Sequence, residues 1–257
     1  MAINVNTVYQ TVLLILNKEQ RGYMTPQEFN NIGNQVQLEI FEKYFEDLNQ
    51  QIRVPQADTD YSDRVTNLDE KISIFKTFGN AIYDATTQPA TPYFTLPTTD
   101  GFGDPITFYR LGTVIYNDEV ELQRLQRGDF YYINKSQLTK PSTSWPVYLY
   151  ENNKLFVKPT EIISKITVDF IRKPKDVIWG FNVGGLGQYL YNSTPFNAAT
   201  QPTGSINFEL QDSEQTEVIL RILMYAGIII RDPQIIQAAA QQVQLHHYKL
   251  QYLIYKT

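Results

Sequence analysis

The spacing of apolar residues changes twice along this chain, and this change limits the folds that it can adopt. Residues 1–75 and 212–257 carry apolar side chains three or four positions apart, the spacing of one helix face. Residues 76–211 hold short β-branched and aromatic runs separated by Pro, Gly, Asn and Asp, which is typical of strands and turns. The sequence therefore predicts an α+β fold. Both ends form a helical bundle, and a mainly antiparallel β region is inserted between them.

The helical segments have clear starting signals. Thr25-Pro26-Gln27-Glu28 combines a capping Thr, Pro at the first helical position and Glu three residues after the cap, which is a capping box. An apolar stripe follows for about six turns, made by Phe29, Ile32, Val36, Ile40, Tyr44 and Leu48. Further helices are expected after Asn4 or Asn6, through Val65 to Phe75, after Asp212 or Ser213, and after Asp232-Pro233.

The β region contains a hairpin signal and one long irregular segment. Val147 to Tyr150 and Leu155 to Val157 flank Glu151-Asn152-Asn153-Lys154, a good turn because Asn tolerates positive φ. Trp179 to Ser205 holds five Gly and two Pro and is predicted to be a long ordered loop or arm that contacts something. Other strands are expected at Ala81 to Tyr83, Tyr93 to Leu96, Ile106 to Tyr116, Ile166 to Ile171 and Ile206 to Leu210, with brief helices in Glu119 to Ile133.

Charge is sparse and unevenly distributed. The chain has 22 basic and 27 acidic residues, a net charge of −5, and its charged fraction of 19% is below the usual quarter. The whole excess of negative charge lies in residues 1–75. With 17 Asn and 22 Gln in the chain, neutral amides keep the surface polar. Such a surface repels copies of itself weakly, which suits a subunit packed among others.

Several kinds of functional site are disfavoured. The absence of Cys excludes disulfides, thiolate metal sites and cysteine nucleophiles. His246 and His247 are neighbours on a predicted helix, so they point about 100° apart and cannot share a metal from one face. Gly184-Gly185-Leu186-Gly187 lacks the Lys-Ser/Thr of a phosphate-binding loop and is interpreted as a turn. Asp58-Thr59-Asp60 and Asp100 to Asp104 lack the Glu of a calcium loop.

The sequence gives no catalytic motif, so we expect no enzyme activity and no cofactor. A Gly-x-Ser-x-Gly nucleophile is absent. A glycosidase carboxylate pair could still lie among Asp118, Glu119, Glu121 and Glu151, because such pairs have no fixed spacing; solvated surface charge is the favoured interpretation. Arg172, Lys173 and Lys175 form only a small basic cluster, which disfavours tight binding of nucleic acid.

The C-terminal segment is apolar on several faces, although a helix packed on one side needs only one stripe. Some of these residues pack inside the monomer, and others are candidates for a subunit interface. The candidates are Ile228, Ile229, Ile230, Leu245, Tyr248, Tyr252 and Tyr255. No apolar run reaches the roughly 20 residues of a membrane span, and Met1 to Asn6 lacks the features of a signal peptide, so no membrane contact is expected.

Three stretches of the chain resemble virion proteins of tailed bacteriophages, most closely those of crAss-like and related short-tailed phages of Bacteroidetes. The first runs from Asn6 to Phe29 and includes Asn17-Lys18-Glu19-Gln20-Arg21-Gly22-Tyr23-Met24-Thr25-Pro26. The second is Pro146 to Pro174, with Leu155-Phe156-Val157-Lys158-Pro159 and Phe170-Ile171-Arg172-Lys173-Pro174. The third is Phe208-Glu209-Leu210, followed by Ser213-Glu214 and Ala226-Gly227-Ile228.

This resemblance implies a head-to-tail connector or tail ring protein. Such a subunit would be assembled in the host cytoplasm and located in the virion neck or tail. It would form a ring, expected to contain 12 copies, that contacts the portal and other ring proteins and surrounds passing DNA without reading its sequence. The resemblance supplies no functional residue. Two alternatives remain open: a tail-associated protein that binds or cleaves glycans, suggested by the many Tyr residues, and a host adaptor domain unrelated to phage.

Overall fold

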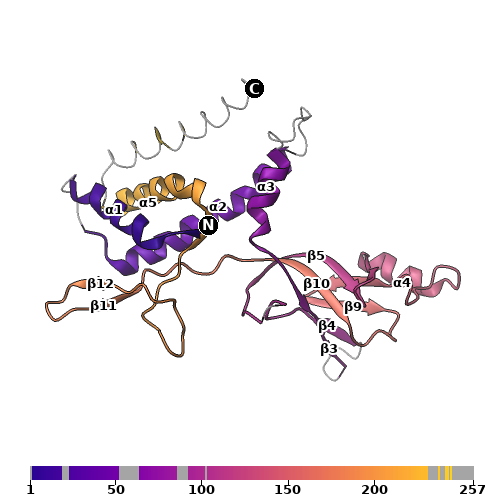
Figure 1. Ribbon diagram of the computed structural model, residues 1–257. Coiled ribbons are helices and arrows are strands. Elements are labelled where there is room, and N and C mark those ends of the chain that lie inside the picture. Colours follow the sequence, from indigo (N-terminus) through magenta and orange to yellow (C-terminus); the bar gives the residue numbers. More distant parts are fainter. Residues whose placement is uncertain are drawn as a thin grey trace. The chain divides into compact units, whose positions relative to one another are not determined.

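The computed structural model describes residues 2–18, 23–51, 64–85, 92–101 and 103–230, together with positions 237, 241, 242 and 244. The protein is α+β, as predicted. It folds as two compact units (Figure 1): a helical unit, Met1–Ile74 with Pro174–Thr257, and a β unit, Phe75–Lys173. The sequence analysis had assigned residues 174–211 to the β region. The structure instead groups them with the helices, because their hydrogen bonds and aromatic contacts are made with the helical unit.

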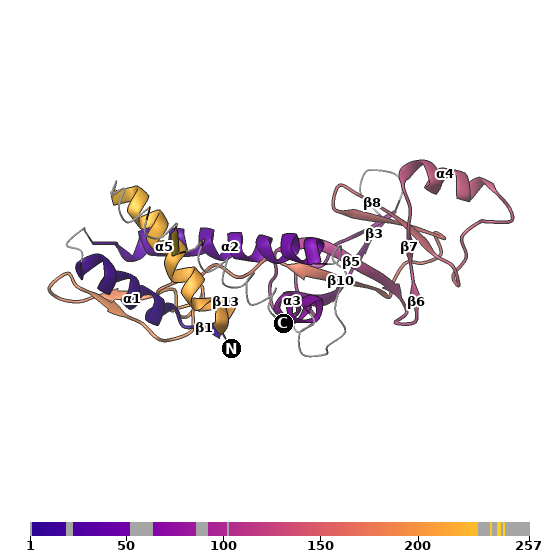
Figure 2. The ribbon, with the colours of Figure 1, turned by 90° about the horizontal axis from the view of Figure 1, so that it is seen from above.

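Both ends of the chain contribute to the helical unit. Helices α1 (Val5–Lys18), α2 (Pro26–Gln51) and α3 (Arg64–Ser73) come from the beginning, and α5 (Gln215–Ile230) follows the short 3₁₀ turn η1 (Asp212–Glu214). Helix α5 packs against α1 and α2, and α3 packs against α2 (Figure 2). The predicted bundle is therefore confirmed. The expected end of this helix at Gly227 is wrong, because α5 continues to Ile230. The last expected helix is described only at positions 237, 241, 242 and 244, which are helical.

The two caps predicted near the start of the chain form, whereas the residue before η1, Gln211, makes no side-chain cap hydrogen bond. Asn4, rather than Asn6, caps α1, because its Oδ1 accepts the backbone N–H groups of Asn6 and Thr7 at 2.9 and 3.1 Å. Thr25 and Glu28 form the reciprocal capping box: Glu28 Oε2 accepts the Thr25 N–H at 2.8 Å, and Thr25 Oγ1 accepts the Glu28 N–H at 3.3 Å. The stripe behind it is buried except at Leu48, which is half-buried.

A short antiparallel pair joins the start of the chain to the segment before α5. Strand β1 (Ala2–Ile3) pairs with β13 (Phe208–Gln211), and Asn207 Oδ1 accepts the Val5 N–H at 3.0 Å. The sequence predicted β13 but not its partner, because a two-residue strand has no detectable alternation.

Strands of the β unit form two sheets that share one core. The first has the order β2 (Lys76–Asn80), β10 (Ile166–Arg172), β5 (Phe108–Tyr116), β6 (Val120–Glu121). The second has the order β3 (Ile82–Asp84), β4 (Tyr93–Thr95), β9 (Lys154–Lys158), β8 (Val147–Glu151), β7 (Gln123–Arg124). Ala81 joins β2 to β3, and Leu122 joins β6 to β7. The two sheets are therefore continuous with each other at both edges, and they enclose buried side chains such as Phe94, Val114 and Phe170.

Two local predictions in the β unit have different outcomes. The hairpin is confirmed: Asn152 and Asn153 take φ values of 51° and 56° between β8 and β9. The expectation of brief helices over Glu119 to Ile133 is wrong for its first half, where the short strands β6 and β7 lie on either side of buried Leu122. Backbone bonds to neighbouring strands decide this segment. Only α4 (Arg127–Lys135), which packs on β8 through Phe130, is helical.

Candidate functional site

The segment over residues 179–205, here called the arm, is an ordered structure in the helical unit. Its first half is the hairpin of β11 (Phe181–Val183) and β12 (Tyr189–Tyr191), visible in Figure 1. Gly184 and Gly187 make the turn: the Gly184 N–H donates to the Gln188 carbonyl at 2.9 Å, and Gly187 has φ of 79°. The glycine cluster is thus a turn, as its sequence suggested.

The second half of the arm is a compact loop closed by its own hydrogen bonds. The Ser205 N–H donates to the Thr194 carbonyl at 2.8 Å, and the Gln201 N–H donates to the Asn197 carbonyl at 2.8 Å. Asn197 Oδ1 also accepts the Ala199 N–H at 3.0 Å, an Asx turn. The arm therefore consists of two consecutive loops with regular backbone pairing.

The two loops cross at their base, where only glycine fits. A Cβ atom on Gly180 would lie 2.3 Å from the carbonyl oxygens of Thr203 and Gly204, and one on Gly204 would lie 2.6 Å from the Phe196 backbone. Ser205 fixes the crossing because its Oγ accepts the Gly180 N–H at 2.9 Å and donates to the Asn192 carbonyl at 2.6 Å.

Amide side chains of α2 hold the strand that enters the arm. Asn30, Asn34 and Gln37 lie at positions i, i+4 and i+7, so they share one helix face, and we call them the amide ladder. Asn30 Oδ1 accepts the Trp179 N–H at 2.7 Å, and Asn34 Oδ1 accepts the Val177 N–H at 2.5 Å. The side chains accept the backbone N–H groups of Val177 and Trp179, which a neighbouring strand would otherwise have to accept.

Gln37 is the most buried member of the ladder and binds both ends of the segment. Its Nε2 donates to the Lys175 carbonyl at 2.8 Å, and its Oε1 accepts the Glu209 N–H at 2.9 Å. The side chain is 2% exposed. A single neutral amide thus ties the chain entering the arm to the chain leaving it, and its two hydrogen bonds satisfy the buried carboxamide.

Aromatic rings attach the arm to α1 and α2. The buried Trp179 ring lies 4.4 Å from Tyr9 and 5.6 Å from Tyr191 between centroids, and Tyr9 lies 4.8 Å from Phe29. Trp179 Nε1 donates to Asn6 Oδ1 at 3.1 Å. Burial, together with a hydrogen bond involving Tyr23, raises the pKa of Tyr9. Tyr9 therefore stays protonated and uncharged within this aromatic cluster.

The far end of the arm exposes several apolar side chains. The arm tip comprises Val183, Leu186, Tyr189 and Leu190, of which Leu186 is 94% exposed and Val183 is 64% exposed. Residues 177–208 contain no Asp, Glu, Lys, Arg or His, whereas about six charged residues would be expected at the average of the chain. The sequence analysis missed this signal, although it can be read directly from the sequence.

An ion-pair network lies between α2 and α5 of the same unit. Glu217 is buried and binds Lys43 at 3.1 Å and Arg221 at 2.8 Å, and Arg221 also binds Glu39 at 3.2 Å. Burial opposes ionisation of Glu217, but Lys43 and Arg221 outweigh this effect and hold its pKa below the usual value. The network fixes α5 on α2. We assign it to stability because each of these charges has a partner.

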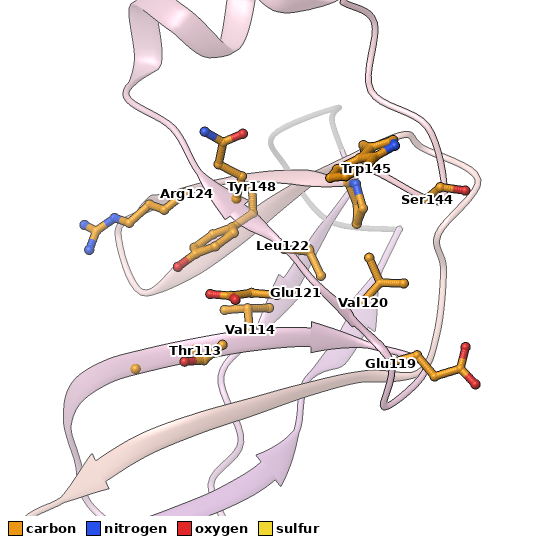
Figure 3. Close-up of a pocket in the computed structure, with 13 residues that line it drawn as sticks. Thr113, Val114, Glu119, Val120, Glu121, Leu122, Arg124, Ser144, Trp145 and Tyr148 are labelled. Carbon is orange, nitrogen blue, oxygen red and sulfur yellow. The ribbon is translucent and has the colours of Figure 1, made fainter.

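The β unit contains a cavity of about 630 Å³ where the chain crosses from one sheet to the other. The crossing forms because the Leu122 N–H donates to the Val114 carbonyl in β5, whereas the Gln123 N–H donates to the Pro146 carbonyl before β8. Figure 3 shows the lining side chains drawn from β5, from the β6–β7 crossing and from the segment before β8. Trp145 lies on this lining with 81% of its surface exposed.

Only two of the four candidate glycosidase carboxylates reach this cavity. Glu119 and Glu121 line it. Asp118 accepts a hydrogen bond from Thr167 Oγ1 at 3.1 Å, and Glu151 forms a bidentate pair with Arg127. The hydrogen bond from Arg127 holds the pKa of Glu151 below its usual value, so this carboxyl is poorly suited to donate a proton.

The other predicted sites are resolved only in part. Asp100 is a turn residue, because its Oδ1 accepts the Asp104 N–H at 2.9 Å. Asp58 to Asp60 and His246-His247 lie outside the described residues, as do Leu245, Tyr248, Tyr252, Tyr255 and the side chains of Ile228 to Ile230. In the part of the chain that is described, no three His, Asp or Glu side chains gather as metal ligands, and no helix is both long and apolar enough to cross a membrane.

No protein-family model matches the chain, and no curated protein matches it significantly.

Proposed function

We propose that this protein is a structural subunit of a bacteriophage particle. In this proposal, copies of the chain form a ring in the neck or tail that joins the portal to the tail and surrounds the DNA channel. The observation that carries it is the arm: a projection held by the amide ladder and by Trp179, and free of charge over residues 177–208.

The chemistry of the arm supports burial against protein. Charged residues are depleted at the centres of protein interfaces, whereas free surfaces are normally kept soluble by charge. A clamped arm also loses little conformational entropy when it docks. In a closed ring each subunit presents one surface to the next copy and a different surface to the previous one.

The charge balance supports a passive relation to DNA. A net charge of −5 provides little of the phosphate neutralisation that drives binding to nucleic acid. A ring of such subunits would let DNA pass without gripping it. Shape and assembly, with no enzyme activity, would then be the function.

Purified virions provide the test of this proposal. We expect mass spectrometry of purified virions to detect the chain in a fixed ratio to the portal protein, and electron microscopy to place it in the neck or tail. The ring would be expected to contain 12 copies. Absence of the chain from purified virions would contradict the proposal.

A second candidate function, glycan binding, is favoured by the cavity of the β unit. An exposed indole such as Trp145 can stack on the apolar face of a pyranose, and Glu119, Glu121 and Arg124 can bind sugar hydroxyls. Titration of the protein with oligosaccharides, followed by tryptophan fluorescence, tests this candidate. A glycan array without any binding would remove it.

A further inference from the structure

A second surface of the helical unit shares the unusual composition of the arm. Residues Ala2–Asn17, which include nearly all of α1, contain no Asp, Glu, Lys, Arg or His. Surface helices normally carry charged residues on the side away from the core. The outer face of helix α1 therefore meets water through neutral polar groups such as Thr7 and Gln10 and through no charged group.

The outer face of α1 is also partly apolar. Val5, Val8, Val12 and Leu16 point inward and are fully buried. Leu14 lies about 160° around the helix from Val12 and is 56% exposed, and the adjoining Ile15 is 37% exposed. An uncharged helix face with an exposed Leu at its centre matches the uncharged arm tip in chemistry.

The two surfaces are not covered by each other within one copy. The base of the arm packs on the inner residues of α1, where Trp179 contacts Tyr9 and Asn6. The opposite end of the arm remains open, since Leu186 is 94% exposed, and Leu14 is exposed as well. Among the described residues, nothing covers Leu186 or Leu14 fully.

We infer that the arm tip of one copy binds the outer face of α1 in the next copy. This inference rests on the proposed function, in which copies of the chain assemble, and names the two surfaces that meet. The contact joins two different surfaces, so it is heterologous, and its repetition leads to a closed ring if the rotation between copies closes. Neither the arm tip nor the outer face of α1 offers a charge. A partner with a charged surface would therefore bury its own charges without an ion-pair partner, which costs free energy.

Single-cysteine cross-linking tests the contact directly, because the chain has no cysteine of its own. Leu186→Cys and Leu14→Cys variants with different affinity tags are mixed and treated with a short bis-maleimide. We expect the mixed product to exceed either homodimer at least tenfold. Glu42→Cys, an exposed position on the charged helix α2, serves as the matched control with Leu186→Cys and should give little product.

Charge insertion provides an independent readout. Leu186→Glu and Leu14→Glu should each weaken self-association at least tenfold in light scattering, with unchanged circular dichroism because both side chains are exposed. A mixture of the two variants retains one intact arm and one intact α1 face. It should therefore form dimers and no larger species.

The other outcomes overturn the inference. Homodimers through Leu186→Cys alone would show that arms meet arms, and a chain that yields no mixed product would show that α1 does not receive the arm. A double variant carries Leu14→Cys and a second cysteine in residues 231–257. If Leu14→Cys forms cross-links only to that second cysteine of the same chain, the outer face of α1 binds residues 231–257 and not the arm. Each result leaves the ring proposal intact if virions contain the chain, so the two failures are distinguishable.

Discussion

The strongest test of the anchored arm is the replacement of Gln37 by Met. The two side chains have similar shape and volume, so Gln37→Met leaves no large cavity. It removes the donor to the Lys175 carbonyl and the acceptor of the Glu209 N–H, which the native carboxamide binds at 2.8 and 2.9 Å. The substitution therefore isolates the two hydrogen bonds from packing.

The expected magnitude follows from the two backbone groups left without their partner. Each costs about 1–2 kcal/mol, toward the lower end of the usual penalty because the sites are only partly buried. We expect the free energy of unfolding of the helical unit to fall by about 2–4 kcal/mol, and its melting temperature to fall by about 5–15 °C.

Fluorescence can follow the helical unit alone. The chain has two Trp residues: Trp145 in the β unit and Trp179 at the base of the arm. In a Trp145→Phe background, urea unfolding monitored at Trp179 reports the helical unit. Gln35→Met is the matched control, since Gln35 is exposed on the same helix and donates to the neighbouring Glu39 side chain at 3.1 Å rather than to a backbone group.

The control should change the stability by no more than about 0.5 kcal/mol. Equal stabilities of Gln37→Met and Gln35→Met would refute the reasoning, because the amide ladder would then contribute no specific hydrogen bonding. An equal loss of unfolding free energy in both variants would indicate an effect of Met on the helix propensity of α2.

Four further predictions concern single positions. Gly180→Ala should disorder the arm, seen as lost amide-exchange protection, whereas Gly185→Ala, whose Cβ meets open space, should not. The pKa of Glu217 is lowered by folding, so its contribution to stability is complete above its unfolded pKa near 4.3 and is lost as the pH falls through its folded pKa. Glu217→Gln should therefore destabilise the protein by about 3 kcal/mol at pH 7. The unfolding free energy from urea denaturation should also fall less steeply at acid pH in this variant than in the native chain. An equally steep fall would contradict this assignment. Tyr44→Phe removes a buried hydroxyl that finds no hydrogen-bond partner among the described residues. It should leave the melting temperature equal or higher, so a clear decrease would reveal a missed partner. Trp145→Ala should leave the melting temperature within about 2 °C, because the side chain is 81% exposed, but should abolish any oligosaccharide-induced fluorescence change.

Local structure was predictable wherever the signal lay within a few residues. The capping box of Thr25 and Glu28 and the positive-φ turn at Asn152 depend on neighbouring atoms, so sequence spacing is sufficient to identify them. The amphipathic spacing likewise fixed which face of α2 is buried. The β6–β7 crossing was missed because the chain changes its hydrogen-bond partner there from Val114 to Pro146, and Pro146 is distant along the chain.

The candidate interface shows the same limit. The sequence identified residues 179–205 as an ordered arm and contained its lack of charge, but it could not reveal which side chains would be buried. The apolar C-terminal candidates, including Tyr248 and Tyr252, lie outside the described residues, so their role stays a prediction.

The sequence by itself determined helices α1, α2, α3 and α5, the capping box at Thr25, the tight turn at Asn152 and the uncharged character of the arm, because each depends on residue type and short-range spacing. Only the tertiary structure decided that the arm belongs to the helical unit and that Gln37 joins its two ends. Contacts between residues 37, 175 and 209 require the chain to close long loops, and many alternative closures satisfy the same local preferences. Packing and the pairing of buried backbone groups select one of them.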